Sequence, residues 1–185
     1  DQTSQRLYLH GLLTWASGDK QQALTTLESS WAQGALDPTG EAMFELYRQT
    51  GEPQKATHFL KEWVAALPQS HRANLLMALS AQGEGREADA IRYYENALRA
   101  SPNVPAALNN LAWLYYQAKD ARAAAVAKRA YELAPTSAAI ADTYGWILVE
   151  TGDVAAGEEV LKTALQLEPT NNEIRDHYEQ ARLRR

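Results

Sequence analysis

Three segments of the chain share one pattern of apolar and polar positions. They are Arg72–Pro102, Ala106–Pro135 and Ala138–Pro169. Each begins with an apolar-rich stretch at helical spacing, passes through a short polar turn, and continues into a second stretch of the same kind before a proline. The pattern predicts a helix, a tight turn and a second helix in every segment, and no strand anywhere in the chain.

Small residues stand inside these helices at positions where two helices of one hairpin would touch. Gly11, Ala23, Gly145 and Gly157 are the clearest cases. Glycine inside a helix costs about 1 kcal/mol relative to alanine, so its placement at these positions favours close packing as the reason. Prolines end the second helices, because the residue before a proline is driven out of the helical region. These prolines are Pro68, Pro102, Pro135 and Pro169.

These residues resemble the tetratricopeptide repeat, a helix-turn-helix unit of about 34 residues. The resemblance covers roughly residues 4–171 and implies an all-α, right-handed superhelical solenoid of five helical hairpins. A polar segment follows and predicts a capping helix that closes the last repeat, which makes eleven helices in all. The expected units are residues 4–36, 37–70, 71–104, 105–137 and 138–171, with the cap at 172–185.

Three units depart from the family pattern. The first lacks the closing proline, and the second carries the bulky Phe44 where the pattern has a small residue. The fourth is one residue short between its two helices. These departures leave the number of repeats unchanged. The shortening makes the register of the second helix in the fourth unit less well defined.

A narrower resemblance lies within residues 107–152, in the sequence ALNNLAWLYYQ…RAYELAP…ADTYGWILVETG. This stretch is similar to the C-terminal repeats of bacterial envelope tetratricopeptide lipoproteins associated with exosortase and exopolysaccharide export. The resemblance implies a periplasmic or cell-envelope setting and favours it slightly over the cytoplasm. Because the chain does not begin with methionine, we expect a processed form or an excised segment.

Composition narrows the function further. The net charge of −5 and the pI of about 5.4 argue against a binder of nucleic-acid backbones, which usually shows a basic patch. The absence of cysteine excludes disulfides and thiolate catalysis. No apolar run reaches the roughly 18 residues of a membrane-spanning helix. We therefore expect that the chain does not bind nucleic acid directly and does not itself span a membrane.

The sequence contains no recognisable catalytic or metal-binding motif. The four histidines form no metal-ligand spacing, and His10 is interpreted as a partly buried packing residue. Gly83 and Gly85 fall where the repeat needs a turn, so they are not assigned to a phosphate loop. We expect no catalytic residue, no metal and no cofactor, and hence a chain that is not an enzyme.

The aromatic residues are divided between core and surface by their repeat positions. Four tyrosines and two tryptophans fall at packing positions and are assigned to the core: Tyr47, Tyr94, Tyr115, Tyr144, Trp31 and Trp63. The resemblance implies that the first helix of each unit lines a concave groove. The candidate groove residues are Tyr8, Trp15, Arg48, Arg72, Gln82, Asn109, Trp113, Tyr116, Asp142 and Trp146.

Trp113, Tyr116 and Trp146 are predicted to form the principal contact patch. Trp113 and Trp146 occupy the same position of successive repeats, so the two indoles should be neighbours. Tyr116 follows Trp113 by three residues and shares its helix face, while Asn109 and Asp142 would orient a ligand. The alternative that both indoles belong to the core remains open.

Some members of the family clamp the carboxylate at the end of a peptide with lysine, asparagine and arginine at set positions. This chain does not match that set. The family's lysine position holds Tyr8, Glu41, Leu75, Asn109 and Asp142.

The sequence thus predicts an interaction module or scaffold that holds a peptide or partner protein. One alternative is the non-catalytic part of a larger enzyme or of a secretion or polysaccharide-export machine. Another is self-association through an uncovered repeat face.

Overall fold

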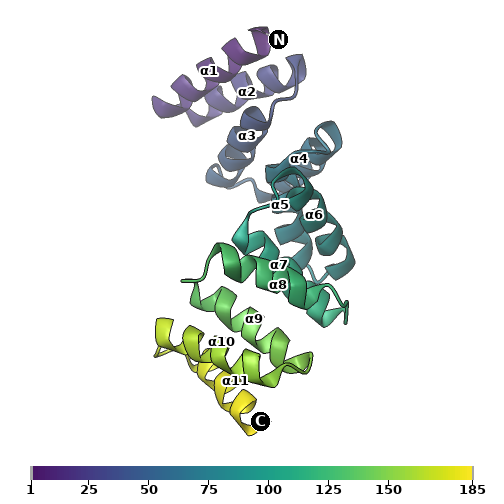
Figure 1. Ribbon diagram of the computed structural model, residues 1–185. Coiled ribbons are helices and arrows are strands. Elements are labelled where there is room, and N and C mark those ends of the chain that lie inside the picture. Colours follow the sequence, from purple (N-terminus) through teal and green to yellow (C-terminus); the bar gives the residue numbers. More distant parts are fainter. Residues whose placement is uncertain (1, 185) are drawn as a thin grey trace. The chain divides into compact units, whose positions relative to one another are not determined.

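The computed structural model describes residues 2–184, and all regular structure within that range is helical (Figure 1). Eleven helices are present in it, which confirms the predicted all-α fold of helical hairpins. The chain forms two compact units, Asp1–Ala100 and Ser101–Arg185. Unit 1 contains α1 (Gln2–Ala16), α2 (Lys20–Gln33), α3 (Asp37–Gln49), α4 (Pro53–Ala66), α5 (His71–Gly83) and α6 (Glu87–Ala100). Unit 2 contains α7 (Pro105–Gln117), α8 (Ala123–Leu133), α9 (Ala138–Glu150), α10 (Val154–Leu167) and α11 (Asn172–Leu183).

The turns inside the hairpins share one backbone conformation. Glycines with positive φ reverse the chain after the first helix in four hairpins, for example Gly85 at φ 70° before α6. In the α7–α8 turn the corresponding residue is Lys119, at φ 56°. A side chain is rarely found in this region. The turn geometry is therefore kept even where glycine is lost.

The one-residue shortening of the fourth unit lies at the start of its second helix. Helix α8 begins at Ala123, four residues after Lys119, whereas α6 begins two residues after Gly85. Helix α8 has 11 residues, against 14 in α6. The fourth hairpin therefore keeps its turn and loses length from the beginning of α8.

Helices α9 and α10 touch through their backbones. A Cβ atom on Gly145 would lie 3.0 Å from the carbonyl oxygen of Gly157, and one on Gly157 would lie 2.7 Å from the carbonyl oxygen of Gly145. Because neither backbone can move away without parting the helices, both positions require glycine. This is the close contact that the sequence predicted for these two residues.

In the second hairpin Phe44 stands where the repeat pattern has a small residue. The small residue at the helix contact is instead Gly40, one turn earlier in α3. Trp63 of α4 is fully buried, and a Cβ on Gly40 of α3 would lie 2.5 Å from its indole ring. The indole nitrogen Nε1 donates a hydrogen bond to Asp37 Oδ1 at 2.9 Å. Phe44 itself is only partly buried at the edge of the core.

Most residues assigned to the core are buried. Tyr47, Tyr94 and Tyr115 are each less than a tenth exposed. Tyr144 is only half-buried and packs against Tyr131, with 5.5 Å between the ring centroids.

The expectation for His10 was wrong, because its side chain is exposed. Helix α1 is the first described helix. No earlier hairpin covers its outer face within residues 2–184, whereas Met43 occupies the equivalent position of α3 and is buried.

Helix α11 packs on α9 and α10 and closes unit 2. Asn171 caps its start by accepting hydrogen bonds from the backbone nitrogens of Glu173 and Ile174. Ile174 and Ala181 are buried against unit 2, while Arg175, Glu179 and Arg182 are exposed. None of the helices in residues 2–184 combines the length and apolar character needed to cross a membrane.

Candidate functional site

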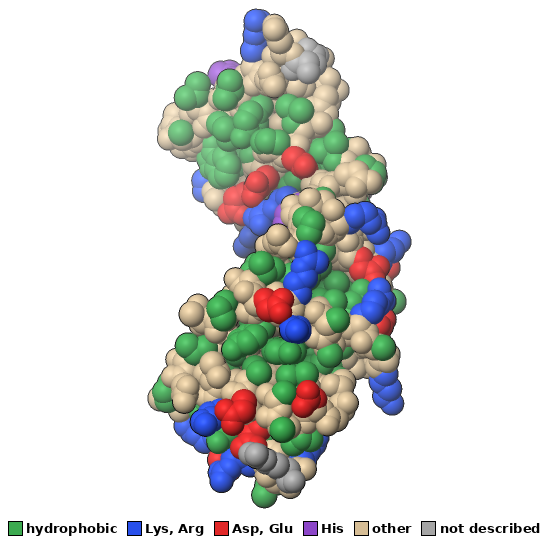
Figure 2. Space-filling model, viewed as in Figure 1, with side chains coloured by type: hydrophobic (Ala, Val, Ile, Leu, Met, Phe, Trp, Pro, Cys, Tyr) green, Lys and Arg blue, Asp and Glu red, His purple; other side chains and the backbone are tan. Residues whose placement is uncertain are grey.

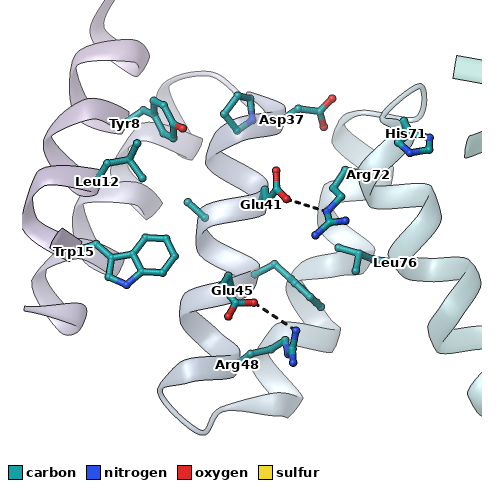
Figure 3. A pocket seen from close by; sticks show the side chains of 13 residues that line it. Tyr8, Leu12, Trp15, Asp37, Glu41, Glu45, Arg48, His71, Arg72 and Leu76 are labelled. Atoms are coloured by element: carbon teal, nitrogen blue, oxygen red, sulfur yellow. Dashed lines mark hydrogen bonds and ion pairs between the residues drawn. The ribbon is translucent and has the colours of Figure 1, made fainter. Parts of the chain in front are cut away.

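One cavity of unit 1 is a groove along the first helices of its three hairpins, α1, α3 and α5 (Figure 3). Its volume is about 630 Å³. We call it the unit 1 groove. Four of the predicted groove residues line it, namely Tyr8, Trp15, Arg48 and Arg72. The structure therefore brings four of the predicted residues, from three separate helices, to one groove.

The wall contributed by α1 is apolar. Tyr8, Leu12 and Trp15 follow one another at spacings of four and three residues, which places them on one helix face. Each is partly buried against the core of unit 1, so its orientation is fixed by packing. Figure 3 shows these side chains turned toward α3, and Figure 2 shows hydrophobic side chains gathered over the part of unit 1 that carries α1–α3.

The facing walls on α3 and α5 carry paired charges. Arg72 Nε of α5 lies 3.0 Å from Glu41 Oε1 of α3, and Arg48 Nη1 lies 3.4 Å from Glu45 Oε2 on the same helix. These side chains are about half exposed. Exposed ion pairs contribute only about 0–1 kcal/mol, so a ligand can replace either partner at little cost.

The corresponding face of unit 2 is covered in part by α11. A smaller pocket of about 240 Å³ remains between α7, α9 and α11, which we call the unit 2 pocket. The predicted residues Asn109, Trp113 and Asp142 line it, together with four residues of the cap: Asn171, Glu173, Ile174 and His177. The cap thus supplies much of a surface that the sequence assigned to α7 and α9 alone.

The two indoles of the predicted contact patch have different neighbours. Trp146 stacks on the imidazole of His177, with ring centroids 4.4 Å apart, and Arg184 Cζ lies 5.3 Å from the Trp146 ring. Arg184 is also paired with Glu150. Trp113 packs instead against Tyr116 of its own helix, at 5.3 Å between centroids. The binding role proposed for these residues stays a prediction.

An ion pair fastens α11 to α9. His177 Nδ1 lies 2.9 Å from Asp142 Oδ1, and both side chains are less than a fifth exposed. The hydrogen bond to Asp142 raises the pKa of His177 above its usual value, and burial opposes this only partly. The protonated imidazole therefore strengthens the contact between the cap and the last hairpin.

Two predicted polar residues have different environments. Gln82 accepts a hydrogen bond from the hydroxyl of Tyr94 at 2.8 Å and lines neither of these two cavities. Asn109 lines the unit 2 pocket, but its buried Oδ1 has no hydrogen-bond partner. Gln82 therefore supports the α5–α6 hairpin, whereas Asn109 keeps an unused acceptor beside the pocket.

Sequence reasoning missed several residues that line the cavities. His71 and Leu76 line the unit 1 groove, while His177 and Glu173 line the unit 2 pocket. Leu76 could have been found from its place four residues after the predicted groove residue Arg72, on the same face of the helix. His177 carries no local motif, and its role follows only from the way α11 lies on α9. No group of three or more metal-ligating side chains was found in the described part of the chain.

Comparisons with known proteins agree with this architecture. A family model described as tetratricopeptide repeat matches residues 75–138. The human Tetratricopeptide repeat protein 7B is 29% identical over 128 residues, which are 69% of this chain. The chain spans 15% of the length of that relative. The family match thus covers part of the chain and supports the repeat assignment made from the sequence.

Solved structures extend the fold similarity to the rest of the chain. MamA from Desulfovibrio magneticus RS-1 superimposes with a TM-score of 0.68 at 19% identity, over 78% of this chain and 82% of its own. Pseudomonas aeruginosa PilF gives 0.65 at 16% identity, over 100% and 90%. The first tetratricopeptide domain of Spaghetti, bound to an HSP90 peptide, gives 0.59 at 20% identity, over 62% and 92%. These similarities establish a shared fold.

Proposed function

We propose that this chain, whose fold is that of tetratricopeptide repeat proteins, is an interaction scaffold that holds a segment of a partner protein in the unit 1 groove. The observation that carries the proposal is the groove itself, with an apolar wall on α1 facing charged side chains on α3 and α5. Clefts of roughly 300–1,000 Å³ with a mostly apolar lining and a few polar groups are typical binding sites. Repeat proteins use such concave surfaces for extended or helical peptides.

The charges of the groove favour an internal segment over a free C-terminus. A terminal carboxylate could replace only the acidic partner of Arg72 or Arg48, and Glu41 or Glu45 would then be left without a cation. A segment that carries both charge signs can exchange partners with both pairs. We infer a ligand with an aromatic or aliphatic anchor for the wall of Tyr8, Leu12 and Trp15, flanked by acidic and basic side chains.

The test is selection of peptides from a random display library on the whole chain, followed by affinity measurement with fluorescence anisotropy. We expect Trp15→Ala to weaken binding at least about tenfold, as truncation of a central aromatic anchor does. The matched control is Leu13→Ala on the same helix, because Leu13 is 71% exposed and does not line the groove. Equal losses in both variants would contradict the proposal.

A second arm separates internal segments from C-termini. Each selected peptide is measured with a free carboxylate, with a terminal amide, and with additional residues at both ends. Affinity should be unchanged across the three forms. Loss of binding in the amidated and extended forms would show that a carboxylate clamp operates here.

The cell-envelope or export setting implied by the resemblance of residues 107–152 is proposed as the place of this interaction. Fractionation of cells that produce the full-length protein tests it. We expect the protein and its partner together in the envelope fraction, and recovery of both only in the cytoplasmic fraction would overturn this part.

A further inference from the structure

A second cavity of unit 1 shares no lining residue with the unit 1 groove. It lies between α2, α3 and α4 and has a volume of about 380 Å³. We call it the aromatic pocket, because Trp31, Tyr47 and Phe59 supply its rings, with Met43 beside them. The two carboxylates of its lining belong to Glu28 and Glu62.

The three rings form a bent wall. Phe59 lies between the other two, with its centroid 5.1 Å from that of Trp31 and 5.9 Å from that of Tyr47. The Trp31 and Phe59 rings meet edge-on at 72°, so they face in different directions. Phe59 and Tyr47 are almost fully buried, whereas Trp31 is only partly buried. Trp31 is therefore the ring most accessible to a ligand.

Tyr47 connects the rings to the carboxylates. Its hydroxyl donates a hydrogen bond to Glu28 Oε1 at 2.8 Å, which fixes both side chains. Burial and this hydrogen bond raise the pKa of Tyr47 far above its usual value, so the phenol stays neutral. The ring keeps its negative face and Glu28 keeps an acceptor for another donor.

The other charged side chains of the pocket come from α4. Lys55 of α4 also lines the pocket, but its ammonium group is paired with Glu52. His58 Nε2 lies 3.2 Å from Glu62 Oε1. Glu28 and Glu62 thus outnumber the one lysine at the pocket, and that lysine already has a carboxylate of its own.

We propose that the aromatic pocket binds an organic ammonium group, carried either by a small quaternary amine or by a lysine side chain. Ring faces attract such cations, most strongly when the cation is removed from water. Carboxylates at the rim add attraction and select against anions and neutral groups. The proposal rests on residues that the unit 1 groove does not use, so it stands or falls independently of the proposed function.

The test uses calorimetry on the whole chain with choline and with its neutral isostere, in which carbon replaces the quaternary nitrogen. Choline should bind at least about tenfold more tightly, since a desolvated cation–ring contact is of that size. N-acetyl-lysine amide and its trimethylated form make up a second arm. Tighter binding of choline assigns the site to small amines, and tighter binding of a lysine derivative assigns it to a protein side chain.

Substitutions should change the affinity for choline in directions that a simple packing gap would not produce. Trp31→Leu should weaken choline binding about tenfold, and Glu28→Gln should weaken it severalfold while leaving an acceptor for Tyr47. Lys55→Gln should strengthen binding, because it removes a like charge. Glu87→Gln on α6, which lines neither the unit 1 groove nor the aromatic pocket, is the control and should leave choline binding unchanged.

The circular dichroism spectrum of each variant shows whether it folds. If Trp31→Leu does not fold, the choline affinities of Glu28→Gln and Lys55→Gln test the proposal. Equal affinity for choline and its carbon isostere would overturn the proposal. So would the absence of binding at about 10 mM ligand, or unchanged affinity in Glu28→Gln and Lys55→Gln.

Discussion

Trp15 of unit 1 and Trp146 of unit 2 both lie on first helices of hairpins, yet their surroundings differ. Trp15 lines the open unit 1 groove, where a ligand can contact its indole. Trp146 is stacked under His177 and approached by Arg184, both from α11. Both residues were assigned to the groove from the sequence, yet only Trp15 lines an open groove. The surroundings of such a side chain depend on what the next element in the chain places on top of it.

The largest stability effect is expected inside unit 2, at the α9–α10 contact. Gly157→Leu should reduce the free energy of unfolding by about 3 kcal/mol, the upper end of the usual cost of overpacking. A Cβ there would lie 2.7 Å from a backbone oxygen and 2.5 Å from Val149 Cγ2, so nothing nearby can yield cheaply. Urea denaturation measures the loss.

The control for that substitution is Gly83→Ala. Gly83 is helical, its φ is not positive, and a Cβ would have no neighbour within 4 Å. Alanine should leave stability unchanged or raise it by about 0.5–1 kcal/mol. A similar loss in both variants would mean that α9 and α10 do not touch as described.

The next largest stability effect is expected at Trp146, with Trp15 as its counterpart in unit 1. Trp146→Ala should reduce stability by about 2 kcal/mol, less than for a fully buried tryptophan, because the side chain is only partly buried. It should also speed hydrogen exchange in α11, since the platform for His177 is gone. Trp15→Ala should leave exchange in α11 unchanged. If the Trp146 variant keeps α11 fully protected, the stacking contributes nothing.

The ion pair between His177 and Asp142 predicts a pH dependence of about 1 kcal/mol, the scale of a partly screened charge-assisted hydrogen bond. The folded-state pKa of His177 is raised above 6.5. Its stabilisation is thus complete below pH 6.5 and is lost as the pH rises through the folded pKa. Unfolding at a series of pH values measures it, and Asp142→Asn should remove the dependence. An unchanged slope in that variant would assign the effect to another group.

The smallest stability effect is expected at the ion pair between α3 and α5. Arg72→Gln should change the free energy of unfolding by less than about 1 kcal/mol, because both side chains are about half exposed. Its effect on peptide affinity should be larger than its effect on stability. The opposite order, measured by denaturation and anisotropy together, would make Arg72 a structural residue.

The hairpins were predictable because their causes are local. Prolines and turn glycines act within a few residues, and the small residues at Gly145 and Gly157 follow from one repeat's pattern. The packing of Trp63 on Gly40 was not predictable, because the repeat pattern expects the small residue at the position of Phe44 and not one turn earlier. The exposure of His10 and the contact of His177 with Trp146 depend on whether a neighbouring hairpin or cap is present. The ends of the five repeat units and the binding roles of the groove residues stay predictions.

The most direct test of the central claim is hydrogen–deuterium exchange of the chain with and without a peptide selected on it. A ligand held in the unit 1 groove slows exchange where it contacts or orders the helices. We predict that added protection is confined to α1, α3 and α5, with α7, α9 and α11 unchanged. Protection that appears on α7 and α9 while α1, α3 and α5 exchange as before would contradict it.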